Sequence, residues 1–524
     1  MAWSLYFGGP IWTMEQRQAT GAVLVEDGVI RAVGDAASAH PQARTAEQID
    51  LQGKSLLPAF LDPHSHFMAC ANAMLQLSVA QARSFSDLQD ILRDHLDKTG
   101  LPAGQWLLAR DFDPSDLKEQ QVPDRTVLDA AAPQNPVVLQ HRSGHVGVLN
   151  SLALQNMGIT DKTPDPAGGH IARRDGRLTG YLEENAFLEV LNRLPPPSLE
   201  QLLQACDRAQ DYYASFGITT VQEGMLTAQM APLYQALCAQ RRQRLDVMGY
   251  SAFQEREQVE QALGKLESDH FRLAGYKIFL DGSPQSCTAW MRTNYEGRES
   301  RGYPTLQDEQ VLQAICQAVQ DGRQLLAHCN GDAAAEQYLQ MLERAAAQGA
   351  DLTKARPVMI HAQLVGLDQL PRLRALGVTP SFFAAHVYHW GEVHRQNVGP
   401  VRAAGISPAA SAGDLGLAYT FHQDAPVLPP DMLETVWCAV NRLTKAGNVL
   451  GGAERVSAYD ALRAVTLSAA LQYGQAAEKG SIAPGKRADF VILDRDPMAV
   501  ASAELREVKV EQTICRGRVL YRKS

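Results

Sequence analysis

The chain has 524 residues, 45% of them hydrophobic and 20% charged, which is typical of a globular protein with a large core. Its formal net charge is −9 and it has no long basic run, so we do not expect nucleic acid as the main partner. The sequence shows no secretion signal, no apolar stretch long enough to span a bilayer, and no Cys-x-x-Cys pair among its eight cysteines. We therefore expect a cytoplasmic protein that acts on a small molecule and does not bind membranes.

Both chain ends are predicted to be β-structure. Short β-rich runs separated by turn residues occur at 22–34, 485–493 and 512–520. The simplest arrangement is a small β-sandwich domain built from residues 1–55 and 481–524, which flanks a central domain formed by residues 56–480.

The central region alternates strands with amphipathic helices. The predicted strands are 56–61, 217–224, 245–250, 273–281, 324–328, 357–361, 378–383 and 418–424. Helices are predicted between them, for example at 308–321 and 333–348. Eight strands that are each followed by a helix predict an α/β fold, the (β/α)₈ TIM-type barrel. The segment at about 68–205 breaks the alternation and ends in Pro195–Pro197, so we expect it to be an inserted subdomain.

Metal-binding or titratable side chains lie at the ends of the predicted strands. His64 and His66 follow the first strand, and the other residues of this kind are Lys277, His328, His361 and Asp424. A single histidine at such a place is more often structural, and His-x-His alone could be a surface turn. A barrel of this type gathers the carboxyl ends of its strands at one mouth, where its chemistry occurs. The combined pattern therefore predicts a metal site.

The sequence resembles the amidohydrolase superfamily, in the branch that includes N-substituted formamide deformylases. The phrases that carry the resemblance are residues 22–28, 63–66, 141–145, 277–283, 327–333, 360–363 and 422–427. The resemblance implies a metal-dependent hydrolase in which His64 and His66 hold one metal and His328 and His361 hold a second. It further implies that Lys277 is carboxylated and bridges the two metals. The alternatives are a single zinc ion, and a plain Lys277 amine paired with Asp281 or Asp424.

The expected cofactor is Zn²⁺, one ion or two, with other divalent transition metals as alternatives. A metal of this kind lowers the pKa of a bound water to roughly 7 and polarises a carbonyl group. Asp424 would accept the proton of the water and pass it to the leaving amine. The expected reaction is the hydrolysis of an amide-like carbon–nitrogen bond in a small molecule such as an N-acyl or N-formyl amine. The alternatives are a cyclic amide, an ester or a deaminase substrate, or a non-catalytic metal-binding regulatory protein.

Further residues are candidates for the substrate pocket. By resemblance, His145 in the insertion would hydrogen-bond the substrate carbonyl, although it could equally be a structural loop histidine. A predicted loop after the seventh strand would line the pocket, or else its aromatic residues would only pack on the barrel. The predicted substrate-binding residues are Trp290, Phe382, His386, His389 and Trp390. His422 lies two residues before Asp424 and would support it or the metal. A homodimer is also an expectation, based on barrels of this size and not on any residue.

Overall fold

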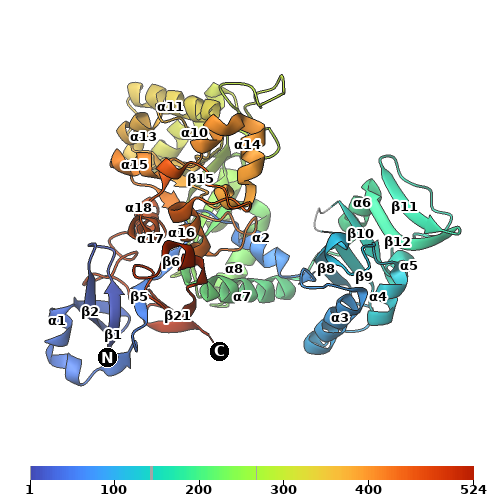
Figure 1. Ribbon diagram of the computed structural model, residues 1–524, viewed down its shortest axis with the longest axis horizontal. Coiled ribbons are helices and arrows are strands. Elements are labelled where there is room, and N and C mark those ends of the chain that lie inside the picture. The colour runs from blue at the N-terminus through green and yellow to red at the C-terminus, as the bar shows by residue number, and fades with distance from the viewer. Residues whose placement is uncertain (1, 142–144, 267, 524) are drawn as a thin grey trace. The chain divides into compact units, whose positions relative to one another are not determined.

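The computed structural model describes residues 2–141, 145–266 and 268–523, and it divides the chain into two units (Figure 1). One unit comprises Met1–Cys70 together with Cys206–Ser524, and the other is Ala71–Ala205. The chain passes between the units through helices α2 (Phe67–Ala73) and α7 (Leu199–Ser215). None of the helices among the described residues is both long and apolar enough to cross a membrane.

The larger unit contains the eight-stranded parallel sheet of a TIM-like barrel, in the order β19-β18-β17-β16-β15-β14-β13-β6. In chain order the strands are β6 (Phe60–Leu61), β13 (Ile218–Leu226), β14 (Asp246–Ala252), β15 (Phe271–Phe279), β16 (Gln324–Cys329), β17 (Val358–His361), β18 (Thr379–Phe382) and β19 (Thr420–Phe421). Each overlaps one of the eight predicted strands. The order in the sheet follows the order in the sequence, so the carboxyl ends of the strands form one rim.

Helices lie between the strands of the barrel from β13 to β19, and the last three of them follow β19. They are α8 (Ala231–Ala239), α9 (Arg256–Leu263), α10 (Asp308–Asp321), α11 (Asp332–Ala347), α12 (Leu352–Ala355), α13 (Leu370–Ala375), α14 (His386–Ala404), α15 (Ala409–Asp414), α16 (Met432–Asn441), α17 (Ala458–Ala464) and α18 (Leu467–Gln472). Helix α10 has the bounds predicted for it, because a capping box at Gln307 starts it and left-handed Gly322 ends it. Its apolar face, which includes Val311 and Ile315, is buried.

Side chains close the seam between the first and last strands of the barrel, β6 and β19, which are not paired with each other among the described residues. Gln472 at the end of α18 donates to the carbonyl oxygen of Pro63 (2.9 Å) and accepts from Thr420 Oγ1 of β19 (2.7 Å). The hydroxyl of Tyr473 donates to the carbonyl oxygen of Asp62 (2.5 Å). These bonds hold the segment that leads from β6 to His64.

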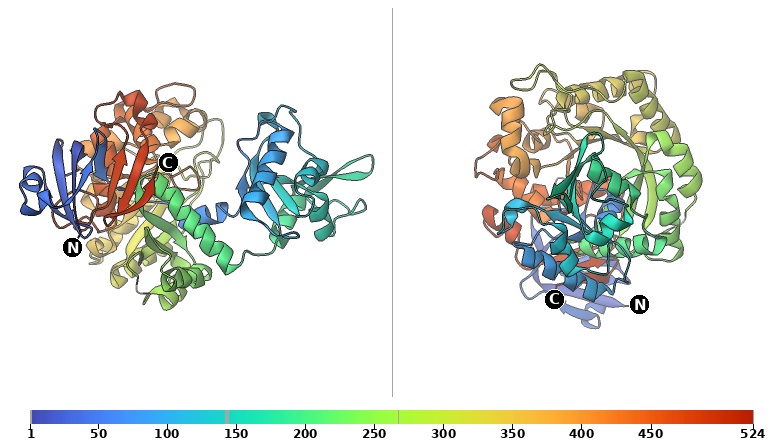
Figure 2. Two further views of the ribbon diagram at one scale, coloured as in Figure 1. Left: turned by 90° about the horizontal axis from the view of Figure 1, so that it is seen from below. Right: turned by 90° about the vertical axis from the view of Figure 1, so that its right-hand side faces the viewer.

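The two chain ends form one mixed sheet, whose blue and red strands lie side by side in the left panel of Figure 2. Its strands are β1 (Trp3–Trp12), β2 (Ala19–Glu26), β3 (Val29–Val33), β4 (Glu47–Asp50), β5 (Ser55–Pro58), β20 (Phe490–Leu493), β21 (Val510–Cys515) and β22 (Arg518–Arg522). Hydrogen bonds connect all of these strands into one sheet. The arrangement of this domain as a two-layered β-sandwich stays a prediction. The run predicted as one strand at 56–61 is two strands, because β5 pairs antiparallel with β20 whereas β6 pairs parallel with β13.

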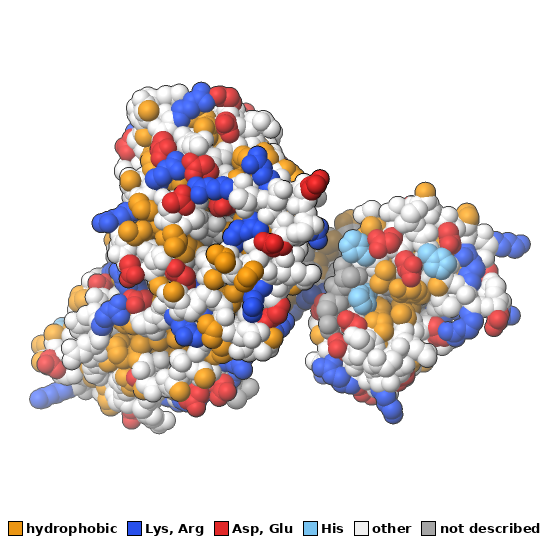
Figure 3. Space-filling model, turned by 45° about the horizontal axis from the view of Figure 1, so that its top comes forward, with side chains coloured by type: hydrophobic (Ala, Val, Ile, Leu, Met, Phe, Trp, Pro, Cys, Tyr) orange, Lys and Arg blue, Asp and Glu red, His pale blue; other side chains and the backbone are white. Residues whose placement is uncertain are grey.

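One buried carboxylate ties this terminal sheet to the base of the barrel. Asp246, at the start of β14, forms ion pairs with Lys479, with Arg487 (3.1 Å) and with Arg516 (2.8 Å). It also lies 2.8 Å from Nδ1 of His270. Elsewhere, basic and acidic side chains alternate over the face that Figure 3 shows.

The unit Ala71–Ala205 has a six-stranded sheet of its own, in the order β11-β12-β10-β9-β8-β7. Its strands are β7 (Leu77–Ser78), β8 (Leu107–Phe112), β9 (Val137–His141), β10 (Val146–Leu149), β11 (Gly169–Arg174) and β12 (Arg177–Glu184). Its helices are α3 (Phe85–Thr99), α4 (Arg125–Ala131), α5 (Ser151–Asn156) and α6 (Asn185–Arg193). Leu88, Leu92 and Leu139 belong to one of its apolar cores. This segment corresponds to the insertion expected at about 68–205.

Candidate metal centre

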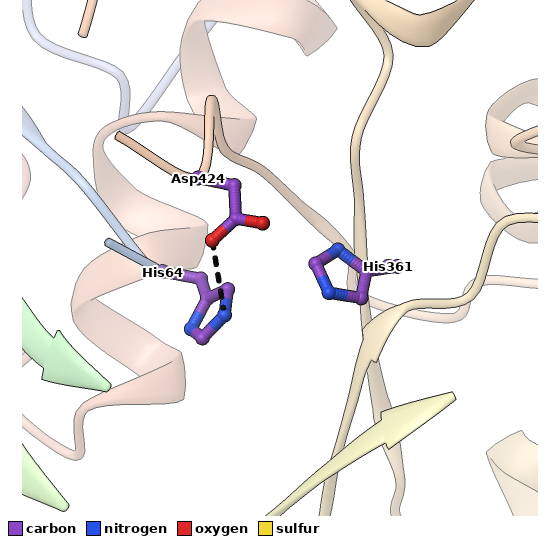
Figure 4. Close-up of side chains that lie close together, drawn as sticks. All are labelled: His64, His361 and Asp424. Atoms are coloured by element: carbon purple, nitrogen blue, oxygen red, sulfur yellow. Dashed lines mark ion pairs between the residues drawn. The ribbon is translucent and has the colours of Figure 1, made fainter. Parts of the chain in front are cut away.

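Three side chains from distant parts of the chain converge at the carboxyl rim of the barrel (Figure 4). His64 follows β6, His361 ends β17, and Asp424 follows β19. One potential ligand atom from each lies within 4.8 Å of the others. His64 Nε2 lies 3.5 Å from Asp424 Oδ1, and the imidazole of His361 faces the same space (Figure 4).

The remaining predicted ligands adjoin these three. His66 Nε2 lies 3.4 Å from Asp424 Oδ1. Lys277, from β15, has its Nζ 3.3 Å from His64 Nε2. His328, from β16, has its Nδ1 3.1 Å from His361 Nε2. The structure therefore brings all six residues, predicted from five different strand ends, into one cluster.

The backbone is strained at two of these residues. His361 has φ 71° and Asp424 has φ 54°. Both lie in the left-handed region of backbone conformation, which residues other than glycine seldom adopt. Such a conformation costs on the order of 1–3 kcal/mol and persists only where the surrounding structure imposes it. Strain of this kind is concentrated at functional sites, in agreement with the position of both residues in the cluster.

Burial keeps three histidines of the cluster neutral. It lowers the pKa of His64 and of His361 well below the usual value, and it lowers the pKa of His328 to about 4. Nearby positive charge, from Lys277 in the case of His64 and His328, acts in the same direction. Neutral imidazole is the form that binds a metal ion, so these residues are in the binding form at pH 7.

Lys277 is a buried amine without a close carboxylate. Its side chain is 1% exposed, and within the described ranges no carboxylate oxygen lies within 4.0 Å of its Nζ. Burial lowers its pKa from 10.5 to about 7, against the opposing effect of Asp424. Asp281, one of its two expected partners, instead accepts backbone hydrogen bonds, including those from Asn330 (2.9 Å) and Gly331 (2.7 Å).

Asp424 supplies a buried acceptor that lacks a donor. Burial acts to raise its pKa, but the opposing effects of its neighbours, of which the imidazole of His66 is the largest, hold the pKa well below its usual value. Among the described residues its Oδ1 has no hydrogen-bond partner. Buried polar atoms are rarely left unsatisfied, and a carboxylate surrounded by neutral imidazoles is a donor set suited to a divalent transition metal. The residues present therefore fit such an ion.

Two residues in the middle of β13 also belong to the site, although the sequence interpretation did not select them. Gln222 Oε1 lies 2.6 Å from His64 Nδ1. Glu223 is buried, which raises its pKa; it accepts from the amide of Met68 (2.8 Å) and lies 4.0 Å from His66 Nδ1. The sequence signal for them was the polar pair Gln222–Glu223 near the carboxyl end of the predicted strand 217–224.

The segment after the seventh strand is a helix, so the prediction of a loop there is wrong. His386–Ala404 form α14, which is interrupted at Trp390 and Gly399. The aromatic and histidine residues recur every four positions, which places them on one helical face. His386 is buried, with its Nδ1 3.2 Å from His394 Nε2 and its ring 4.6 Å from that of Trp390.

The other predicted substrate-binding residues take different places. Phe382 is fully buried against Phe421 in the barrel. Its neighbour Phe383 is the one beside the cluster, with its ring 5.1 Å from His422 and 6.3 Å from His361. His389 bonds Glu434 (2.6 Å). Trp290 is partly buried in the segment after β15, where its backbone amide donates to Asp281 (2.9 Å).

His145 belongs to the unit Ala71–Ala205. There it is exposed, and its Nδ1 lies 3.2 Å from Glu184 Oε2. Residues 142–144 of the phrase 141–145 lie outside the described residues. The role expected for His145 at the substrate stays a prediction.

Comparison with known proteins agrees with this geometry. Residues 47–521 match the Amidohydrolase family. The chain is 30% identical to an N-substituted formamide deformylase from Arthrobacter pascens, over 96% of this chain and 95% of that protein. It is 27% identical to YtcJ of Bacillus subtilis, which is named as an amidohydrolase, over 99% of this chain and 100% of that protein.

A solved structure has the same fold. It is an uncharacterized metal-dependent hydrolase from Pyrococcus furiosus, with a TM-score of 0.75 and 24% identity over 95% of this chain and 100% of that chain. The match over nearly the whole length covers both chain ends and the barrel. The chain therefore belongs to the amidohydrolase family, and it is a metal-dependent hydrolase that acts on carbon–nitrogen bonds.

Proposed function

We propose that this protein hydrolyses the carbon–nitrogen bond of an N-acyl or N-formyl amine, with Zn²⁺ as its cofactor. The observation that carries the proposal is the cluster of four histidines, a lysine and an aspartate at the rim of the barrel. The similarity to an N-substituted formamide deformylase over nearly the full length supports this substrate class. Formamides and other N-acyl amines share the bond that would be cleaved.

The proposed ligands fall into two groups. His64 and His66 would hold one ion, and His328 and His361 a second. Lys277 would bridge them as a carbamate, formed when its neutral amine attacks CO₂ and loses a proton. Carboxylation would convert a buried amine into an anion with two ligand oxygens. The lack of a carboxylate close to Nζ within the described ranges supports it. When bound, the ions would supply Lewis acidity, which makes a coordinated water more acidic and polarises a carbonyl group.

Asp424 would transfer the proton in this reaction. Its low pKa keeps it ionised at neutral pH, and its Oδ1 lies in the cluster with no hydrogen-bond partner in the described part of the chain. It would accept a proton from the attacking water and deliver it to the amine nitrogen. Delivery matters because an amide nitrogen is a poor leaving group until it is protonated.

Aromatic side chains beside the cluster favour an apolar substituent on the substrate. Phe383 lies against His361 and His422, and the ring of Trp390 is 6.2 Å from that of Phe383. A substrate with an aromatic or bulky apolar group on nitrogen would gain the burial energy of that group there.

The test is a substrate panel offered to zinc-loaded and cobalt-loaded protein. It contains N-formyl and N-acyl amines, hydantoins and carboxylic esters, and product is measured as released amine, opened ring or acid. We expect amine release from the first group, with faster turnover for N-benzyl than for N-methyl compounds. Protein stripped with a chelator is the control, and activity should return when Zn²⁺ is added.

Two outcomes would overturn the proposal. Turnover restricted to hydantoins or esters would assign a different substrate class to the same site. Purified protein that neither contains a transition metal by elemental analysis nor binds one when it is offered would remove the chemical basis of the proposal.

A further inference from the structure

Gln222 links the proposed metal ligand His64 to the closed seam of the barrel. It lies in the middle of β13, and its side chain is completely buried. Its Oε1 lies 2.6 Å from His64 Nδ1. Its Nε2 donates to the carbonyl oxygen of Pro63 (2.8 Å) and to the hydroxyl of Tyr473 (3.3 Å).

The Pro63 carbonyl determines which way the Gln222 amide faces. A carbonyl oxygen only accepts hydrogen bonds, so the atom 2.8 Å from it must be the amide nitrogen. The opposite orientation would set two oxygens against each other in a buried place. Tyr473 agrees with this assignment, because its hydroxyl donates to the carbonyl of Asp62 and is left to accept from Gln222. The oxygen of the amide therefore faces His64.

This orientation of the amide in turn determines which ring nitrogen of His64 carries the hydrogen. The amide oxygen of Gln222 accepts and cannot donate, so His64 Nδ1 must be the protonated ring nitrogen. A neutral imidazole has one N–H, which leaves Nε2 with its lone pair. That nitrogen faces the centre of the cluster, 3.3 Å from Lys277 Nζ and 3.5 Å from Asp424 Oδ1.

We propose that Gln222 is a positioning residue that holds His64 as the Nδ1–H tautomer, so that Nε2 presents its lone pair to the metal. The inference rests on the proposed function and deepens it, because it assigns a task to a residue that binds neither metal nor substrate. The seam supports it in turn, because Gln472 donates to the same Pro63 carbonyl and Gln222 also donates to Tyr473, the residue that follows Gln472.

Close packing keeps the ring of His64 in this orientation. Gly224 lies beside it, and a Cβ built on Gly224 would stand 2.8 Å from Cε1 of His64. Any larger residue at position 224 would displace the ring. The imidazole is therefore confined by Gly224 and held through Nδ1 by Gln222.

The test compares the affinity for Zn²⁺ of three variants with that of the wild type. Gln222→Met keeps the length of the side chain and removes all three of its side-chain hydrogen bonds. Gln222→Glu keeps an acceptor for His64 Nδ1. Gln324→Met is the matched control, because Gln324 is 1% exposed and likewise makes three side-chain hydrogen bonds, to Tyr250, Arg356 and Gln472, at the start of β16.

Affinity is measured by competition with a chelating dye after the protein has been stripped of metal. We expect Gln222→Met to bind Zn²⁺ roughly 10–100-fold more weakly, the usual effect of removing the partner of a ligand histidine. Gln222→Glu should recover most of the loss, and Gln324→Met should match the wild type. Equal affinity in Gln222→Met and the wild type, or an equal loss in Gln324→Met, would overturn the inference.

A second measurement needs no folded variant of Gln222. Long-range proton–nitrogen spectra of metal-free wild-type protein, labelled at the histidine ring nitrogens, report the tautomer of each histidine. The His64 signal is assigned by its loss in His64→Gln. We expect the Nδ1–H pattern, and the Nε2–H pattern would refute the role of Gln222. Wild-type protein that shows the Nδ1–H pattern but binds no Zn²⁺ would count against the proposed function and still support the placement of His64 by Gln222.

Discussion

Replacing Lys277 by methionine should stabilise the protein when metal and CO₂ are absent. The pKa of Lys277 is lowered from 10.5 to about 7 by burial. At pH 7 the unfolded lysine is fully protonated, whereas the folded one is about half protonated. Linkage converts this difference into a penalty of about 4 kcal/mol on the folded state, which an uncharged side chain of similar length avoids.

The penalty has a defined dependence on pH. Between pH 7 and pH 10.5 the unfolded wild type binds more protons than the folded one, so the stability of the wild type rises with pH. The advantage of Lys277→Met should therefore shrink, to about 1 kcal/mol at pH 9.5. Any gain from packing the methionine is the same at both pH values and cancels in the comparison.

The assay is urea unfolding of chelator-stripped protein in bicarbonate-free buffer at pH 7 and pH 9.5. Lys354→Met is the control, because Lys354 is exposed and its charge stays in water. When Zn²⁺ and bicarbonate are added together, the wild type should become more stable than Lys277→Met. Metal binding stabilises the wild type, and the variant has lost the proposed bridge. A variant less stable than the wild type at pH 7, or an advantage that does not change with pH, would refute the reasoning.

Three further predictions concern Asp424, Asp246 and the buried histidines. Asp424→Asn should keep its metal content, measured by elemental analysis, but lose about 10²–10⁴-fold in kcat; near-normal turnover would exclude the proposed proton transfer. Asp246→Asn should lower the free energy of unfolding by about 3–5 kcal/mol in urea, because it leaves the amine of Lys479 buried without its charged partner; a loss under 1 kcal/mol would contradict this. The metal-free protein should lose thermal stability as the pH falls from 6.5 to 4. In that window the unfolded state binds more protons, because burial lowers the pKa of His328 to about 4 and that of His422 to about 3; a flat profile of melting temperature against pH would contradict it.

Much of the architecture was predictable because its signals are local. Runs of apolar residues, such as the one that ends in His361 and the one that contains Lys277, indicate buried parallel strands from composition alone. One general rule then joins the strands, since a barrel brings all their carboxyl ends to one rim. The six residues of the cluster could therefore be selected without knowledge of any distance between them.

Contacts between distant residues could not be predicted in this way. Gln222 meets His64 across 158 positions, and Gln472 meets Pro63 across 409. Which atoms meet depends on how the seam closes, and no local pattern encodes that. The choice between Phe382 and Phe383 is similar, because a shift of one residue on a strand reverses the face to which a side chain points.

The sequence by itself determined the family, the order of strands and the residue types that could bind a metal, because these follow from periodicity and from motifs a few residues long. Only the tertiary structure decided that the segment after the seventh strand is a helix, that Asp281 is committed to backbone amides, and that Lys277 is buried with no carboxylate beside it among the described residues. Those properties arise from burial and from partners that only folding brings together.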